Sequence, residues 1–362
     1  MKYQNWSDKP APIRPGEELA LERLQEYLYK KLPNTLGELQ VEQFRKGFSN
    51  LTYSIQLGKQ QFVLRRPPIG ANIKSAHDMS REYKILSSLY MVYPKAPKAL
   101  LYCGDESVIG APFYLMERVE GVILRSHLPK EMALPHGLMA QIAEAFVESL
   151  VALHYVDFEA ASLADLGRPQ GYVQRQIEGW TRRYQNAKTD EIPEMTNIAR
   201  WLAENMPAKS GPALIHNDFK YDNIVLDPQD ISQVIAVLDW EMATIGDPLM
   251  DLGTMLGYWI DPDDPPAMQM LKLIPTTMPG NPSRAEIADY YAHKSGRDVG
   301  NIVFYYVYGL FKIAVIVQQI YSRYKKGHTR DTRFVGLIEA VKTCSLLAVQ
   351  AIDKGRIEKL FL

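Results

Sequence analysis

The spacing of apolar residues changes character near residue 121 of this 362-residue chain. Before that point, short runs that alternate between apolar and polar positions are typical of β-strands, and Gly-containing turns join several of them. Five strands are predicted, at residues 39–44, 52–57, 61–65, 98–103 and 113–118. Apolar residues at helical spacing predict one helix at residues 17–31 and another at 78–89, between the third and fourth strands.

Helical spacing dominates after residue 121. Helices are predicted at residues 138–155, 171–186, 196–204, 250–259, 284–295, 302–324 and 331–359. The two strand signals in this part lie at 223–227 and 234–238, with turn-forming residues between them. We therefore predict a two-lobed α+β fold. Residues 1–120 form an N-terminal lobe with a five-stranded antiparallel sheet, residues 121–362 form a mostly helical lobe, and a hinge lies near 119–122.

The most apolar stretch of the chain, residues 302–320, raises the question of a membrane span. Lys312 lies in its middle, and Gln318 and Gln319 lie near its end. A lone lipid-exposed helix tolerates such residues poorly, so we predict a helix buried in the core of a soluble helical lobe.

Bulk composition favours a soluble globular protein and excludes several classes of partner. Apolar residues make up 46% of the chain and charged residues 23%, with a net charge of −1, which offers no field for attracting nucleic acid or an anionic membrane. The two cysteines form neither a metal-binding spacing nor a disulfide framework. With no signal-peptide pattern at the N-terminus, we expect a cytoplasmic protein that binds neither nucleic acid nor membrane. The composition is compatible with any oligomeric state.

One segment concentrates residues that suit phosphoryl transfer. His216 and Asp218 precede Asn223 in the pattern H-x-D-x-x-x-x-N, and Asp239 follows the second predicted strand of this region. Phosphoryl transfer needs a carboxylate that orients a hydroxyl nucleophile, and an amide oxygen and a second carboxylate that hold magnesium against the nucleotide phosphates. We predict Asp218 as the catalytic carboxylate and Asn223 and Asp239 as magnesium ligands.

The predicted sheet lobe supplies a positive charge for the nucleotide. Arg65 ends the third predicted strand, where Val63 shares its face while Phe62 and Leu64 face the core. Glu82, on the helix that follows, is placed to pair with Arg65 and fix its direction. Alternatively, these charges are a solvated strand end and a helix surface.

Two further segments are candidates for nucleotide contacts. The loop at residues 45–50 contains Gly47, Ser49 and Asn50, which allow backbone N–H groups to approach phosphate oxygens, although an ordinary hairpin turn has a similar composition. Where the lobes are predicted to join, the backbone of Glu117 and Val119 is placed to bind the edge of an adenine base.

In this order, these segments resemble the aminoglycoside phosphotransferase family, the small-molecule branch of the protein-kinase-like fold. The resemblance spans residues 43–256, and its motifs lie at Arg65, Glu82, 216–223 and Asp239. It implies a kinase that transfers the γ-phosphoryl group of ATP to a small-molecule hydroxyl with Mg²⁺. It also implies that His216 braces the catalytic loop, that Arg65 replaces the usual phosphate-contacting lysine, and that Asp251 accepts hydrogen bonds from loop backbone. GTP is the alternative nucleotide.

A finer resemblance concerns the substrate. Gly171, Tyr172 and Trp180 resemble the kinase domains fused to some acyl-CoA dehydrogenases and their stand-alone bacterial relatives, some of which act on 4-hydroxyacyl-CoA thioesters. The basic run at residues 323–333 suits an anionic substrate such as a CoA ester. The acidic residues at 261–264 favour an amine instead, unless they form an exposed turn. Aminoglycoside, macrolide and amino-alcohol kinases therefore remain alternatives, as does a non-catalytic, nucleotide-binding pseudokinase.

Overall fold

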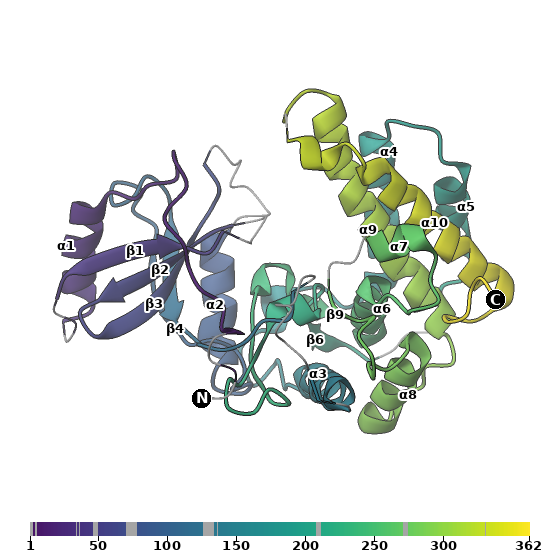
Figure 1. The fold of residues 1–362 in the computed structure, drawn as a ribbon, viewed down its shortest axis with the longest axis horizontal. Helices are drawn as coiled ribbons and strands as arrows, with labels where there is room; N and C mark the ends of the chain where they lie inside the picture. The colour runs from purple at the N-terminus through teal and green to yellow at the C-terminus, as the bar shows by residue number, and fades with distance from the viewer. Residues whose placement is uncertain are drawn as a thin grey trace. The chain divides into compact units, whose positions relative to one another are not determined.

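The computed structural model describes residues 3, 6–33, 35, 37–45, 50–69, 78–125, 134–135, 137–207, 211–270, 274–329 and 331–362. The chain divides into two compact units (Figure 1). Unit 1 consists of Met1–Ile123, Glu159–Leu163 and Val225–Met242, and unit 2 consists of Leu124–Phe158, Ala164–Ile224 and Ala243–Leu362. The sequence predicted one boundary near residue 120. The compact units differ from it, because two later segments of the chain belong to unit 1.

Unit 1 is built on a five-stranded antiparallel sheet with the strand order β1-β2-β3-β5-β4. Its strands are β1 (Leu39–Gln43), β2 (Leu51–Leu57), β3 (Gln60–Arg66), β4 (Ala99–Cys103) and β5 (Phe113–Glu117). All five predicted strands are confirmed to within one or two residues.

The two faces of this sheet are covered by different helices, α1 (Leu21–Lys31) and α2 (Met79–Leu89) (Figure 1). Leu24 and Leu28 of α1 pack on one face, together with Phe62 and Leu64 of β3. Since side chains alternate along a strand, Arg65 points to the other face, where α2 lies. The predicted orientation of β3 is confirmed.

Unit 2 is mostly helical. Its helices are α3 (Leu138–His154), α4 (Tyr172–Ala187), α5 (Pro193–Glu204), α6 (Pro248–Tyr258), α7 (Pro266–Met270), α8 (Arg284–Ser295), α9 (Ile302–Lys325) and α10 (Leu337–Lys354). The long helix α9 packs against α4, α6 and α10, and α3 packs against α8 (Figure 1). Apolar spacing predicted all of these helices except α7.

Two short ladders flank the predicted catalytic loop. The strands β7 (Ile224–Leu226) and β8 (Val234–Val237) form the predicted hairpin. The strands β6 (Ala213–Ile215) and β9 (Thr244–Gly246) form a second, antiparallel pair in unit 2. The sequence predicted neither β6 nor β9, because three residues are too few to show an alternating pattern.

The last predicted helix was too long at both ends. A 3-10 turn at Thr332–Phe334 precedes α10, which ends at Lys354 instead of residue 359. Gly355 stops the helix there, since its φ of +62° is a left-handed conformation that glycine adopts without a steric penalty.

The apolar helix α9 is long and apolar enough to span a membrane by length and composition, and it is the one such helix among the described residues. In its most apolar window, 72% of the residues are buried inside the protein. This burial confirms the prediction that residues 302–320 form a core helix.

Candidate active site

The loop that follows β6 presents Asp218 surrounded by hydrogen-bond donors. Its Oδ2 atom accepts hydrogen bonds from Lys220 Nζ at 2.7 Å and from Asn223 Nδ2 at 2.9 Å. Its Oδ1 atom accepts one from the hydroxyl of Tyr258 at 3.0 Å. Three donors therefore fix the orientation of the carboxylate that the sequence predicted as catalytic.

Asp218 also orients the side chain of Asn223. Its Nδ2 atom also donates to the backbone carbonyl oxygen of Asp218, at 2.8 Å. Since the amide nitrogen makes both contacts, the carbonyl oxygen Oδ1 is the atom of Asn223 that can bind a cation. Amide oxygens are suitable ligands for magnesium.

The backbone of this loop is held by a fully buried carboxylate. Asp251 of α6 accepts hydrogen bonds from the backbone N–H groups of His216 at 2.6 Å and Asn217 at 2.7 Å. His154 Nε2 lies 3.2 Å from the same carboxylate, and its Nδ1 lies 2.8 Å from the hydroxyl of Tyr291. The predicted role of Asp251 as an acceptor for loop backbone is confirmed.

The surroundings of Asp251 and His154 determine which of the two side chains is ionised. Burial tends to raise the pKa of Asp251, but the hydrogen bond from His154 and the contacts with His216 outweigh it, so the pKa lies below its ordinary value. Burial lowers the pKa of His154. The arrangement therefore favours an ionised Asp251 and a neutral His154.

His216 lies entirely inside unit 2. Its Nδ1 atom accepts a hydrogen bond from the backbone N–H of Asp218 at 3.3 Å, and its ring packs edge-on against Phe219. In this position the imidazole supports the loop from within.

Sequence reasoning missed Lys220 and Tyr258. Burial tends to lower the pKa of Lys220, but the charge of Asp218 and the nearby Tyr258 hydroxyl raise it above its ordinary value, so the amine stays protonated. Lys220 was detectable as a basic residue two positions after Asp218. Tyr258 had no sequence signal, because it comes from the end of α6, forty residues further along the chain.

In unit 1, Arg65 forms the centre of a second group of charges. Its Nη1 atom lies 2.6 Å from Glu82 Oε1, and its Nη2 atom lies 3.1 Å from Asp239 Oδ1. Glu241 Oε2 lies 3.9 Å from Nη2. Burial tends to lower the pKa of Arg65, but Glu82 and Asp239 raise it well above its ordinary value. The structure therefore shows the predicted pairing of Arg65 with Glu82.

Asp239 follows β8 in a left-handed backbone conformation, with φ at +68°. Such a conformation is unusual for a residue other than glycine and is common at functional sites. The side chain of Asp239 is 29% exposed, whereas that of Glu82 is 1% exposed. Among the three carboxylates near Arg65, that of Asp239 is the most exposed and therefore the most accessible to a cation.

The remaining predicted nucleotide contacts are partly described. Gly47 and Ser49 lie outside the described residues. Asn50 is buried and donates a hydrogen bond from Nδ2 to Glu241 Oε2 at 2.6 Å, so its side chain supports the charged group around Arg65. Glu117 donates its backbone N–H to the carbonyl of Lys98 at 2.9 Å, and Val119 follows the end of β5.

The structure thus brings the predicted site residues together in two groups. Asp218, His216 and Asn223 lie in unit 2, and Arg65, Glu82, Asn50 and Asp239 lie in unit 1. Across the described ranges, no group of three or more His, Cys, Asp or Glu side chains is arranged to hold a metal ion.

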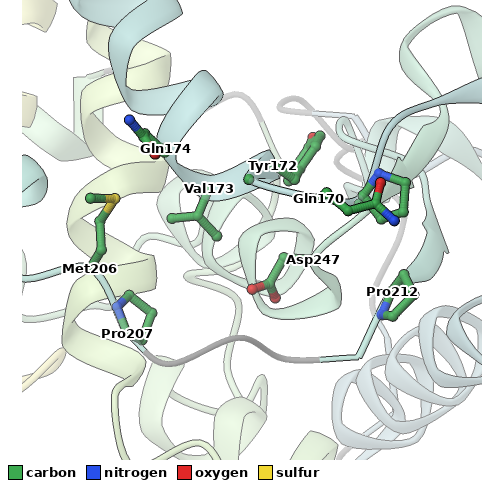
Figure 2. Close-up of a pocket in the computed structure, with 11 residues that line it drawn as sticks. Gln170, Tyr172, Val173, Gln174, Met206, Pro207, Pro212 and Asp247 are labelled. Atoms are coloured by element: carbon green, nitrogen blue, oxygen red, sulfur yellow. The ribbon is translucent and has the colours of Figure 1, made fainter.

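A cavity of about 370 Å³ lies elsewhere in unit 2, at the start of α4 (Figure 2). Tyr172, Val173, Met206 and Pro207 give it a mainly apolar wall, and Asp247 is a charged residue of its lining (Figure 2). Asp247 Oδ1 caps α6 by accepting from the backbone N–H of Leu249. The predicted site residues do not appear among the described residues that line this cavity.

Comparison with known proteins identifies the family. Residues 40–282 match the model of the phosphotransferase enzyme family. The chain is 37% identical over 326 residues to acyl-CoA dehydrogenase family member 11 of Mus musculus, in an alignment that covers 87% of this chain and 41% of the mouse protein. This chain therefore spans about two fifths of the length of that relative.

Solved structures agree with this match. A crystal structure from Ralstonia eutropha, of a protein named as an aminoglycoside phosphotransferase, is 30% identical with a TM-score of 0.79, over 93% of this chain and 99% of the other. A GDP complex of an aminoglycoside 2′-phosphotransferase has the same fold, with a TM-score of 0.60 at 16% identity, over 90% of this chain and 98% of the other. The predicted family, the kinase-like α+β fold and the assignment as a phosphotransferase are confirmed. The chain belongs to the phosphotransferase enzyme family.

Proposed function

We propose that this protein transfers the γ-phosphoryl group of ATP, with Mg²⁺, to a hydroxyl group of a small molecule. The observation that carries this proposal is the paired geometry of Asp218 and Asn223, in which one amide nitrogen binds both the carboxylate and the carbonyl oxygen of Asp218. That arrangement supports the proposal, because phosphoryl transfer requires a proton acceptor close to oxygen atoms that can bind magnesium.

The hydrogen bonds of Asp218 assign its two oxygens to different tasks. A carboxylate oxygen has two lone pairs, and Oδ2 already accepts from Lys220 and Asn223. Among the contacts of the described residues, Oδ1 accepts from Tyr258, which leaves it one lone pair for the acceptor hydroxyl. In the proposed reaction the hydroxyl oxygen bonds to the γ-phosphorus, its proton passes to Asp218, and the bond to the β–γ bridging oxygen breaks.

In this proposal Asn223 and Asp239 supply oxygen ligands to magnesium. The metal neutralises charge on the phosphate oxygens when it is bound. Arg65 keeps Asp239 in place through Nη2, while Glu82 holds the other end of the guanidinium. Arg65 therefore contributes to nucleotide binding both by its charge and by holding a metal ligand.

For the acceptor, we propose a hydroxyacyl-CoA thioester. The similarity to a protein named for acyl-CoA dehydrogenation supports this substrate. The exposed basic residues Arg323, in the last turn of α9, and Lys326, just after it, support it as well. The competing acidic segment is unsuited to bind an amine, because Asp261 and Asp264 are buried and both contact Arg284. The prediction that this segment is an exposed turn was wrong for these two residues.

An ATP-consumption screen tests the proposal. The protein is assayed with Mg²⁺ against hydroxyacyl-CoA thioesters, aminoglycosides, macrolides and amino alcohols, each with ATP and with GTP. We expect consumption of ATP and a phosphorylated product with the hydroxyacyl-CoAs, with the Asp218→Asn protein as the blank. Turnover with aminoglycosides or amino alcohols alone would reject the proposed substrate and keep the phosphotransferase assignment.

A non-catalytic nucleotide-binding protein is the alternative of another class. It predicts nucleotide binding, measured by calorimetry, without phosphate transfer to any acceptor in the screen. The residues at these positions argue against it, because Asp218, Asn223 and Asp239 still carry the carboxylate and amide groups that phosphoryl transfer requires.

A further inference from the structure

Helix α9 carries a lysine where its composition favours apolar residues. Lys312 is 1% exposed and lies between Phe311 and Ile313, both of which are also buried. Burying an ammonium group is costly unless specific partners compensate for the lost water. The groups that contact the Lys312 ammonium group therefore indicate what this buried charge does.

Those partners belong to the catalytic loop and to α4. Lys312 Nζ donates to the backbone carbonyl oxygen of Asn217 at 2.7 Å and lies 3.4 Å from Asn217 Oδ1. It also lies 5.9 Å from the centre of the Trp180 ring, within the range of a cation–π contact.

The charges around Lys312 come from several elements of unit 2. Asp218 of the loop and Asp251 of α6 attract its ammonium group, and Lys220 and Arg183 repel it. Burial is the largest influence and lowers the pKa of Lys312 to about 8.

The contact with Asn217 fixes a peptide plane. The carbonyl of Asn217 and the N–H of Asp218 belong to the same planar peptide unit. Lys312 binds its oxygen, and His216 Nδ1 accepts from its N–H at 3.3 Å. The plane that immediately precedes the Cα of Asp218 is therefore held at both ends.

The backbone of Asn217 lies in the left-handed region, with φ at +68°. Asparagine adopts this conformation more readily than most non-glycine residues, and it marks a sharp change of chain direction immediately before Asp218. Asp251 holds the N–H of Asn217, and the hydroxyl of Tyr172 lies 3.3 Å from its Nδ2. Lys312 adds the contact that holds the carbonyl of Asn217, and with it the orientation of the peptide that follows.

A close helix crossing sets the position of Lys312. A Cβ added at Gly309 of α9 would lie 2.0 Å from the carbonyl oxygen of Gly253, and one added at Gly253 of α6 would lie 2.1 Å from the carbonyl oxygen of Tyr305. The two helices therefore touch through their backbones. The crossing lies within one helical turn of both Asp251 and Lys312, the two charges that bind the loop backbone.

We propose that Lys312 is a positioning residue for phosphoryl transfer, which fixes the peptide plane between Asn217 and Asp218 and thereby directs the Asp218 carboxylate toward the acceptor hydroxyl. This inference rests on the proposed function in so far as it concerns turnover. Lys312 acts through the loop backbone and not by contact with the substrate.

A matched pair of variants tests the role. Glutamine and methionine have side chains of equal length, but only glutamine can donate to a carbonyl. Under the proposal, Lys312→Gln retains at least 10-fold more kcat than Lys312→Met, while both keep the KM for ATP of the wild type. If the residue only fills space, methionine suits this apolar helix better, and Lys312→Met would be at least as active as Lys312→Gln. That result would overturn the proposal.

Hydrogen exchange provides a readout that does not require turnover. We expect the backbone amides of the catalytic loop, residues 216–223, to exchange faster in Lys312→Met than in Lys312→Gln, with no such difference in α10. Equal exchange in the two variants would overturn the proposed constraint. If the variants show the expected exchange difference but the wild type transfers phosphate to no acceptor, the proposed function fails and the constraint on the loop stands.

Discussion

The two units of this protein use buried charge in different ways. In unit 1, the buried guanidinium of Arg65 forms ion pairs with the carboxylates of Glu82 and Asp239, so one charged side chain contacts two others. In unit 2, Asp251 and Lys312 bind backbone N–H and carbonyl groups of the catalytic loop. The first arrangement orients side chains, and the second determines the path of the main chain.

This difference predicts different consequences of substitution. In unit 1, Arg65 has two close carboxylate partners, Glu82 and Asp239. If a substitution removes one of them, Arg65 keeps the other as an acceptor. In unit 2, Asp251 and Lys312 bind the backbone of the loop that carries Asp218, so their loss acts on the main chain of the loop itself. We therefore expect substitutions in unit 1 to act mainly on nucleotide affinity and those in unit 2 mainly on kcat.

The largest effect is expected from Asp218→Asn. The substitution removes the proton acceptor but keeps an oxygen for Tyr258, so kcat should fall by about 10²- to 10⁴-fold. Nucleotide affinity, measured by calorimetry with Mg²⁺, should remain within about 3-fold of the wild type. Normal turnover by this variant would remove Asp218 from the mechanism.

The matching substitution in unit 1 is Asp239→Ala. Loss of a magnesium ligand should weaken binding of nucleotide in the presence of Mg²⁺ by about 100-fold, because the metal links protein and phosphates. Binding measured with EDTA should change far less and is the control. An unchanged affinity with Mg²⁺ would contradict the metal role of Asp239 and weaken the contrast between the units.

Much of this arrangement was predictable because it is local in sequence. The pattern from His216 to Asn223 places a carboxylate and an amide within one loop, and the two contacts between them need no other element. Alternation along β3 likewise predicted that Arg65 faces away from Phe62 and Leu64. The five strands and most helices followed from apolar spacing alone.

What the sequence did not predict depends on distant contacts. Lys312 was visible only as a charge that interrupts an apolar helix, since its partner Asn217 is ninety-five residues away. Tyr258 is forty residues from Asp218, and β9 is too short for a pattern. The acidic segment appeared to be a turn because Arg284, which pairs with it, lies twenty residues further on.

Asp251→Asn tests the backbone support in unit 2. An amide in this place keeps one acceptor oxygen where the carboxylate had two, so one backbone N–H loses its partner at a cost of about 1–3 kcal/mol. We expect a lower free energy of unfolding and a kcat about 10-fold lower, with the KM for ATP unchanged.

The pH dependence of unfolding provides a second check on Asp251. Because its pKa is lower in the folded than in the unfolded state, its stabilising contribution is present above the ordinary pKa and is lost as pH falls through the folded value. The stability difference between wild type and Asp251→Asn should therefore narrow as pH falls below about 4. A difference that stays constant would contradict the ionised state of Asp251.

Glu82→Gln is the corresponding test in unit 1, with a smaller expected effect. The introduced amide would be a neutral acceptor for Arg65, which keeps its contact with Asp239 at 3.1 Å. We expect the KM for ATP to rise by about 3- to 10-fold and kcat to change less, because charge-assisted hydrogen bonds are stronger than neutral ones. A fall in kcat without a change in nucleotide affinity would mean that the two units do not differ as described.

The smallest effect on activity is expected from Asp261→Asn, in the acidic segment of unit 2. Arg284 keeps its two contacts with Asp264, at 2.6 and 2.7 Å, so the buried guanidinium retains a bidentate partner. We expect kcat and KM within about 2-fold of the wild type for any acceptor, since a buried pair of this kind supports the fold and not the reaction. A selective loss of activity toward amines would instead show that this carboxylate binds the substrate.

The stability of Asp261→Asn should also depend on pH differently from that of the wild type. Burial raises the pKa of Asp261 to about 7, although Arg284 opposes the shift. Between about pH 4 and 7 the folded protein therefore binds a proton that the unfolded chain has lost, so this group makes the wild type less stable as pH rises through that range. Asp261→Asn should lack this slope when unfolding is followed from pH 4 to 8. If the two proteins show parallel stability curves, Asp261 is ionised throughout this pH range. Arg284 would then stabilise two buried carboxylates, those of Asp261 and Asp264.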